Sequence, residues 1–231
     1  GSGASYSVVV APSANTEGAL GLSLKAGAVT DAAANPNALS AAPAQPIDTL
    51  APTAQSLNPA DNATGVAIDA NLVLTFSEAI QRGTGTVVLK TAAGATVATY
   101  DAATSANLSL SGTTLTVNPS ANLAYASGYY LEIGALAVRD LAGNAFAGLS
   151  GSTAYNFTTA APPDTTAPTV SFADDTPGTA SASVTYTLSF SEAVTGLGSD
   201  DFTISNGTLS SISGSGASYS VVVAPSANTE G

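Results

Sequence analysis

The chain has 231 residues, of which 45% are hydrophobic and only 9% are charged, and its formal net charge is −12 at pH 7. Because 16 acidic residues stand against four basic ones, the sequence speaks against nucleic acid as a partner. Cys and His are absent, which excludes disulfides, zinc-finger sites, cysteine nucleophiles and Ser-His-Asp triads. The remaining chemistry is that of carboxylate, amide and hydroxyl oxygens, which suit hard cations such as Ca²⁺. We also expect no membrane span, since no apolar run approaches roughly 20 residues.

The two ends of the chain carry the same 18 letters, GSGASYSVVVAPSANTEG, at residues 1–18 and 214–231. The start-to-start distance gives a repeat period of 213 residues, which is typical of a tandem array. Because Met is also absent, we expect a window on a longer array. The alternative is that separate subunits join head to tail and add strands to their neighbours. We favour a segment of a longer array, because separate subunits would bring two copies of the SYSVVV strand to a position that takes only one.

Alternating hydrophobic residues predict half-buried β-strands along the chain, and helical periodicity does not recur. The clearest stretches, in chain order, are residues 6–10, 20–24, 72–76 and 184–190. Short strands separated by Gly, Asn, Pro and Ser turns favour an all-β fold made of β-sandwich modules.

A weaker repeat lies within the long period, because three motifs occur twice, and they follow the same order once the 213-residue period is applied. They are DTLAPT at 48–53 with DTTAPT at 164–169, FSEA at 76–79 with FSEA at 190–193, and VRDLAGN at 138–144 with VTDAAAN at 29–35. We therefore predict one complete module at residues 48–163. Residues 164–231 form the first part of a second module, and residues 1–47 form the last part of its preceding copy. Proline-rich stretches before each module predict short, semi-rigid linkers.

These motifs resemble bacterial Ig-like repeats of large surface and secreted proteins. The first module resembles surface-layer-type Ig-like domains through NPADNATGVAIDANLVLTFSEAI and YYLEIGALAVRDLAGNAFAG. The second resembles the Ig-like repeats of giant adhesins through APTVSF, TLSFSEAVTGLGSDDFTISNGTL and VTDAAANPNA. The family pattern D-x-A-G-N becomes Asp31-Ala32-Ala33-Ala34-Asn35. If the Gly of the pattern takes a left-handed conformation, either Ala34 is strained or the turn differs here. The resemblance implies tandem immunoglobulin-like sandwiches, one of them split across the chain ends.

The topology of such a sandwich predicts where the repeated acidic motifs meet. The start of the first strand, the B–C loop and the F–G loop lie at one pole. We therefore expect convergence of one set in the complete module and of a second set in the split module. The first set is Asp48, Glu78, Asp140 and Asn144, and the second is Asp164, Glu192, Asp31 and Asn35. In the second set, Asp31 and Asn35 of this chain belong to the preceding copy.

Converging carboxylates need a counter-charge, and four basic residues are too few to supply it. Ca²⁺ is the cation that we expect, because it takes 6–8 oxygen ligands. The resemblance agrees, since related adhesin repeats bind calcium near module joints. The alternative is that the Asp and Asn side chains only cap turns through hydrogen bonds to nearby backbone, and both roles can coexist.

The expected function is structural, as the repeat unit of an extracellular or cell-surface stalk or filament stiffened by calcium, of the adhesin or biofilm type. Its partners would be adjacent copies, head to tail, and its low charge favours lateral self-association. The alternative is a carbohydrate- or cell-binding adhesion module. An enzyme is not expected, because the adjacent pairs Asp174-Asp175 and Asp200-Asp201 point to opposite faces of a strand and make no acid/base couple.

Overall fold

The computed structural model describes residues 3–227, and the chain divides into two compact units, Gly1–Pro162 and Pro163–Gly231. Each unit is described by itself below. The first two and the last four letters of the duplicated stretch lie outside the described residues. Within residues 3–227 every regular element except one 3₁₀ turn is a β-strand, which confirms the predicted all-β class.

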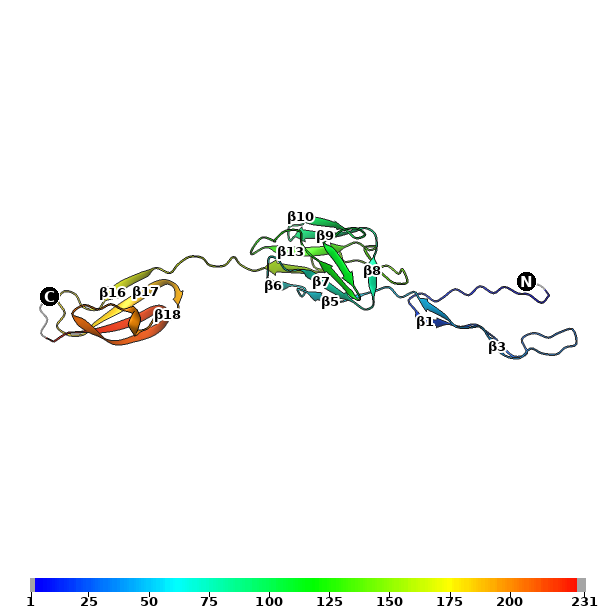
Figure 1. Ribbon diagram of the computed structural model, residues 1–231, viewed down its shortest axis with the longest axis horizontal. Helices are drawn as coiled ribbons and strands as arrows, with labels where there is room; N and C mark the ends of the chain where they lie inside the picture. The colour runs from blue at the N-terminus through cyan, green and yellow to red at the C-terminus, as the bar shows by residue number, and fades with distance from the viewer. Residues whose placement is uncertain (1–2, 228–231) are drawn as a thin grey trace. The chain divides into compact units, whose positions relative to one another are not determined.

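A two-layer sandwich forms the larger part of the first unit (Figure 1). One sheet has the order β10-β9-β13-β15-β6, and the other has the order β11-β12-β7-β5. All neighbours are antiparallel except β15 and β6, and a separate ribbon pairs β14 with β8. The strands are β5 (Ala54–Asn58), β6 (Ala63–Val66), β7 (Leu72–Phe76), β8 (Ile80–Arg82), β9 (Thr86–Thr91), β10 (Thr96–Asp101), β11 (Leu108–Ser111), β12 (Thr114–Val117), β13 (Gly128–Ile133), β14 (Val138–Asp140) and β15 (Asn156–Thr159).

The core of this sandwich follows from the alternation in the sequence. Leu72 and Leu74 have no exposed surface and Phe76 is 3% exposed, while the residues between them on β7 are only half-buried. The ring of Phe76 meets that of Phe146 edge to face, with centroids 5.1 Å apart. Each such side chain contributes about 1.5–3 kcal/mol on burial. The predicted strand at 72–76 is therefore confirmed, and its apolar face holds the two layers together.

A smaller, open part precedes the sandwich in the same unit. Its strands are β1 (Glu17–Leu20), β2 (Ser23–Leu24), β3 (Ser40–Ala41) and β4 (Gln45–Asp48). β1 pairs with β4 and β2 pairs with β3, both antiparallel. We call residues 17–48 the arm. The predicted strand at 6–10 is wrong for this copy, because these residues have no ladder partner among the described residues.

The second unit is a single sheet of order β16-β17-β18. Its elements are β16 (Val170–Asp174), β17 (Val184–Val194), the 3₁₀ turn η1 (Ser199–Asp201) and β18 (Gly207–Pro225). The predicted strand at 184–190 is confirmed within β17. β18 contains the second copy of SYSVVV, which here pairs with β17. The same letters are therefore a strand at residues 218–223 and form no strand at residues 5–10, because only the second copy lies beside another strand in the described part of the chain.

Among the described residues, no helix is both long enough and apolar enough to cross a membrane.

Replacing a core residue of β7 tests the assignment of the two faces. We expect Leu74→Ala to lower the free energy of unfolding of the sandwich by about 2–5 kcal/mol, because it leaves a cavity between the layers. Urea unfolding followed by tyrosine fluorescence measures this. The control is Thr75→Ala, whose side chain points to the other face and should cost well under half as much. Equal losses for the two variants would contradict the assigned faces.

Candidate metal centre

Three carboxylates meet where the arm enters the sandwich. Asp48 ends β4, Glu78 lies in the bend between β7 and β8, and Asp140 ends β14. One oxygen from each lies within 4.8 Å of the others. The pairing of β14 with β8 sets Asp140 opposite Ile80, two residues beyond Glu78, and so brings the two carboxylates together. The structure thus gathers three acidic residues that are distant in sequence, and we call them the acidic cluster.

Asp140 organises the turn that follows β14. Its side chain has no exposed surface. Oδ1 accepts hydrogen bonds from the backbone N–H groups of Gly143 at 2.6 Å and Asn144 at 2.8 Å, and Oδ2 accepts one from Asn144 Nδ2 at 2.7 Å. Gly143 has a φ of +100°, a region that a residue with a Cβ rarely adopts. The turn chemistry that the sequence offered as an alternative is therefore present at this site.

Asn144 bridges the arm and the turn. Its Nδ2 donates to the carbonyl oxygen of Asp48 at 3.2 Å and to Asp48 Oδ1 at 3.4 Å, besides the bond to Asp140. Asn144 thus converges with the acidic cluster, but it presents its NH₂ group to the carboxylates. Coordination of a cation by its side-chain oxygen would require the amide to turn by about 180°. In this structure Asn144 positions the two aspartates.

Among the described residues, no basic side chain forms an ion pair with the acidic cluster. The ion pair found within the described residues joins Lys90 Nζ to Glu132 Oε2 at 2.6 Å, on the sheet that contains β9 and β13. Arg82 donates to backbone carbonyls, and Arg139 donates to the carbonyl of Gly143. Burial raises the pKa of Glu78 above its usual value, and the charges of Asp140, Asp48 and Glu17 raise it further. The carboxylates therefore repel one another when all are ionised.

The geometry fits a hard divalent cation. Two oxygens bound to one Ca²⁺ at about 2.3–2.6 Å lie at most about 5 Å apart. The three carboxylate oxygens meet this limit, since they lie within 4.8 Å of one another. Asp48, Glu78 and Asp140 offer the oxygen ligands that Ca²⁺ prefers, and an ion between them would supply the missing positive charge.

The second set of predicted residues is only partly together. Asp164 and Glu192 contact each other in the second unit, where burial and then the charge of Asp164 raise the pKa of Glu192. The pKa of Asp164 is lowered, first by the hydrogen bond from the N–H of Thr166. Leu50 makes the same bond to Asp48, so the two linkers turn alike.

Asp31 and Asn35 lie in the arm, within the first unit. Asp31 Oδ1 accepts from the N–H groups of Ala33 and Asn35, both at 2.9 Å, and Asn35 Nδ2 donates to Asp31 Oδ2 at 2.9 Å. These bonds, led by the one from the Asn35 side chain, lower the pKa of Asp31. Ala34 has a φ of +67°, so the departure from Gly does place a Cβ in the left-handed region.

Two contributors escaped the sequence analysis. Glu17 pairs with Asp48 in the β1–β4 ladder and adds its charge to those around Glu78. Gln81 donates from Nε2 to the carbonyl of Asp140 at 2.6 Å and fixes the end of β14. Neither stands in a repeated motif of the complete module, so only the strand register could have indicated them.

Two family models, each described as a bacterial Ig-like domain, match the chain at residues 48–159 and 164–231. A comparison with curated protein sequences gave no match. Together with the two-layer antiparallel sandwich, these matches define the class of protein as immunoglobulin-like. The chain therefore carries bacterial Ig-like domains at residues 48–159 and 164–231, as its motifs indicated. Domains of this kind are typical of extracellular and surface proteins of bacteria.

Removing one charge from the acidic cluster tests the repulsion. In a calcium-free buffer with EGTA at pH 7, we expect Glu78→Gln to raise the midpoint of thermal unfolding of the sandwich, because it relieves repulsion without changing the shape of the side chain. Calorimetry measures the change. The control is Glu132→Gln, which removes the partner of Lys90 and should leave the midpoint unchanged or lower it. A lower midpoint for Glu78→Gln than for the unchanged chain would refute uncompensated repulsion.

Proposed function

We propose that this chain is a structural repeat unit of an extracellular bacterial stalk or filament, of the adhesin-extender type. The observation that carries the proposal is the acidic cluster, three carboxylates without a basic partner at the point where the arm enters the sandwich. Ca²⁺ bound there would supply positive charge and coordinate oxygens from three segments. The repeat period and the split second module support propagation from copy to copy, head to tail.

The residues of the site suit a joint whose stiffness depends on a cation. Asp48 belongs to the arm, whereas Glu78 and Asp140 belong to the sandwich. Without a counter-charge, repulsion pushes the Asp48 carboxylate away from the other two, against the hydrogen bonds that Asn144 donates to Asp48. When a cation neutralises the charges, the arm is held to the sandwich at two points. One is the pair of hydrogen bonds that Asn144 donates to Asp48, and the other is the cation that the carboxylates share. The angle of the joint would then be fixed.

A carbohydrate- or cell-binding adhesion module is the second candidate, and it has less support. Such a module would need a platform of exposed aromatic rings. Of the three neighbouring tyrosines that the sequence offers, Tyr129 and Tyr130 are only 6% and 7% exposed, and Tyr125 alone is open at 44%. Buried rings stabilise the core and leave little surface for stacking on a sugar.

We do not propose an enzymatic activity. The adjacent acidic pairs act in local turns: Asp174 Oδ1 accepts from the N–H of Thr176, Asp175 Oδ1 from that of Thr185, and Asp201 Oδ2 from that of Gly198. Carboxylates bound in this way cap backbone groups. The partners that we propose are further copies of the repeat, joined end to end and associating sideways, outside the cell.

Thermal unfolding of the full chain with and without calcium tests the metal site. With a dissociation constant of about 0.1 mM, about 10 mM Ca²⁺ stabilises the sandwich by roughly 2.7 kcal/mol, since the ion binds only the folded state. We expect calorimetry to show a higher midpoint that EGTA reverses. Glu78→Gln and Asp48→Asn should abolish the shift, and Glu132→Gln should keep it. Identical curves in calcium and EGTA would eliminate calcium as the organiser of the joint.

A distance measurement tests whether the ion also stiffens the joint. The chain has no Cys, so Ala41→Cys on β3 and Thr96→Cys on β10 carry spin labels at defined places. Both positions are exposed. We expect the distribution of distances between the labels to narrow in calcium, because the arm is then held at Asp48. The label pair in a Glu78→Gln background should stay broad in both buffers; narrowing in that background as well would disconnect stiffness from the acidic cluster.

A further inference from the structure

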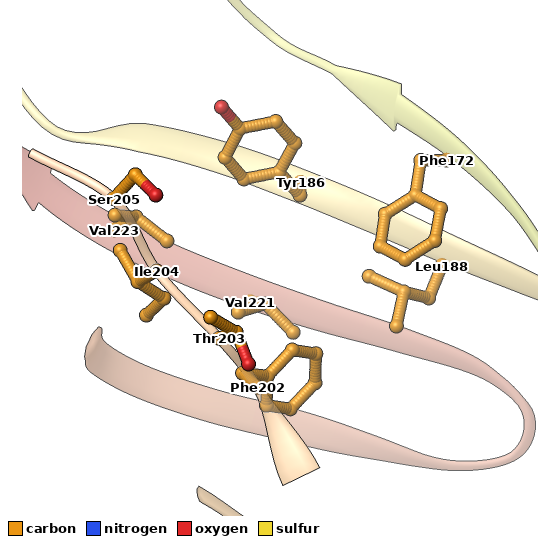
Figure 2. Close-up of a pocket in the computed structure, with 9 residues that line it drawn as sticks. All are labelled: Phe172, Tyr186, Leu188, Phe202, Thr203, Ile204, Ser205, Val221 and Val223. Atoms are coloured by element: carbon orange, nitrogen blue, oxygen red, sulfur yellow. The ribbon is translucent and has the colours of Figure 1, made fainter. Parts of the chain in front are cut away.

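The sheet of the second unit has an apolar face that, within the described residues, the segment after η1 covers only in part. Figure 2 shows side chains from β16, β17 and β18 and from the segment after η1 around one hollow of about 240 Å³. Among the apolar residues that line it are Phe172, Tyr186, Leu188, Phe202, Ile204 and Val221. Leu188 and Val221 are 2% exposed, whereas Phe172 is 62% and Tyr186 36% exposed. A half-covered face of this kind marks a docking surface.

The complete sandwich shows what these positions look like when a second layer is present. Leu57 pairs with Leu74 across β5 and β7 as Phe172 pairs with Leu188 across β16 and β17. Leu72 stands two residues before Leu74, as Tyr186 stands before Leu188, and Leu72 is fully buried. The exposure of Phe172 and Tyr186 therefore reflects a missing layer, since β16 and β17 pair at Phe172 and Leu188 as β5 and β7 do at Leu57 and Leu74.

The arm has the backbone structure of that missing layer. Residues 24–40 repeat the hydrogen bonds of residues 133–149 at a constant offset of 109 residues. The matching pairs are Ala28 N–H to Lys25 O with Ala137 N–H to Gly134 O, Asp31 N–H to Asn35 O with Asp140 N–H to Asn144 O, and Asn37 N–H to Val29 O with Phe146 N–H to Val138 O. The pairing of Leu24 with Ser40 likewise matches that of Ile133 with Leu149.

The apolar face of the arm is also uncovered. Leu22, Leu24 and Val29 are 44%, 46% and 53% exposed. Their counterparts at the same offset are Leu131, Ile133 and Val138, which are 0%, 2% and 1% exposed. Together with Tyr6 and Val8, the three arm residues line an open groove of about 770 Å³. In the complete sandwich, the segments that correspond to the arm and to the second unit cover each other's apolar faces. In this chain both of these faces are exposed.

We infer that the apolar face of the second unit is the docking surface for residues 19–47 of a second copy of this repeat. The sequence supports this occupant, because Gly18, the equivalent of the final residue Gly231, is followed directly by Ala19. The inference rests on the proposed head-to-tail assembly and names the surfaces that make it. The docked segment adds the second layer to the split module.

The complete sandwich also fixes the register of the docked segment. There Arg139 of β14 lies opposite Gln81 of β8. The offset of 109 puts Thr30 in the place of Arg139, and the FSEA motif puts Thr195 in the place of Gln81. The equivalence is structural, since Ser191 exchanges hydrogen bonds with Thr169 as Ser77 does with Thr53. Thr30 of one copy should therefore lie opposite Thr195 of the next.

The edge that would receive Thr30 is open among the described residues. The FSEA motif puts Val194 in the place of Ile80. Val194 pairs with Gly216 on one side, and on the corresponding side the N–H of Ile80 donates to the carbonyl of Gly112. On its other side Ile80 pairs with Asp140. Docking would set Asp31 against Val194 in the same way and bring it to Asp164 and Glu192, so the second acidic set would be completed by two copies.

Disulfide trapping between two single variants of the full chain tests the proposed register. Residues directly opposite on antiparallel strands have Cα atoms about 4.5–5.5 Å apart, within the range of a disulfide. Thr30→Cys and Thr195→Cys proteins, mixed and oxidised in EGTA, should give a heterodimer whose cross-linked peptide is identified by mass spectrometry. The control partner is Thr187→Cys, exposed on the opposite face of β17 from Leu188. We expect the yield of its heterodimer with Thr30→Cys to be lower by a factor of roughly ten or more than the yield with Thr195→Cys, because docking does not hold those two thiols together.

A further substitution separates docking from chance collision. Leu22→Asp in the Thr30→Cys protein should abolish the heterodimer, and it should not unfold the chain, because Leu22 is already 44% exposed. Equal trapping at Thr187→Cys, or trapping that survives Leu22→Asp, would overturn the inference. A Thr30→Cys/Thr195→Cys chain that oxidises mainly to a closed monomer would also overturn it, since the arm would then dock on its own chain.

The outcome is independent of calcium. If the heterodimer is trapped in EGTA but calcium does not raise the midpoint of thermal unfolding, the proposed metal site is refuted and the docking surface is kept. A calcium shift without specific trapping would keep the metal site and refute the docking surface.

Discussion

A β-sheet with one apolar face is stable only when a second layer covers that face, and this constraint governs the whole chain. In the sandwich of residues 54–159 both layers are present, and Leu72, Leu74 and Leu131 lose all contact with solvent. The arm and the second unit each have one layer, and several of their apolar side chains, such as Leu24 and Phe172, stay exposed. The end-to-end joining that we propose would bury these side chains.

The acidic cluster stands at the seam that this architecture produces. β4 brings Asp48 from the arm, and the ribbon of β8 and β14 brings Asp140 beside the bend that holds Glu78. The same arrangement begins again in the second unit, where Asp164 meets Glu192. In both places a linker aspartate faces the acidic residue of FSEA. Charge is scarce in this chain, and these groups of neighbouring carboxylates are the places where we propose that a cation acts.

Much of this organisation could be predicted from the sequence, because it depends on exact repetition and on alternation. The strands around Leu74 and Leu188 were visible as alternating residues, and the topology of a sandwich brought Asp48, Glu78 and Asp140 to one pole. The contribution of Glu17 was not visible, since it depends on the register of β1 with β4. The amide orientation of Asn144 was also beyond the sequence, because it follows from which hydrogen bonds the folded turn leaves open. The stretch at 6–10 was expected as a strand, and it lacks a partner because pairing depends on a neighbour as well as on the residues themselves.

The left-handed Ala34 has a mechanical consequence. A residue with a Cβ costs about 1–2 kcal/mol in this conformation, whereas Gly143 adopts its positive φ freely at the equivalent place. The turn at residues 31–35 therefore stores strain that the corresponding turn at residues 140–144 avoids. In the assembly that we propose, pulled from both ends, this strain would lower the load at which the module containing Ala34 opens, compared with the same module carrying Gly at that position.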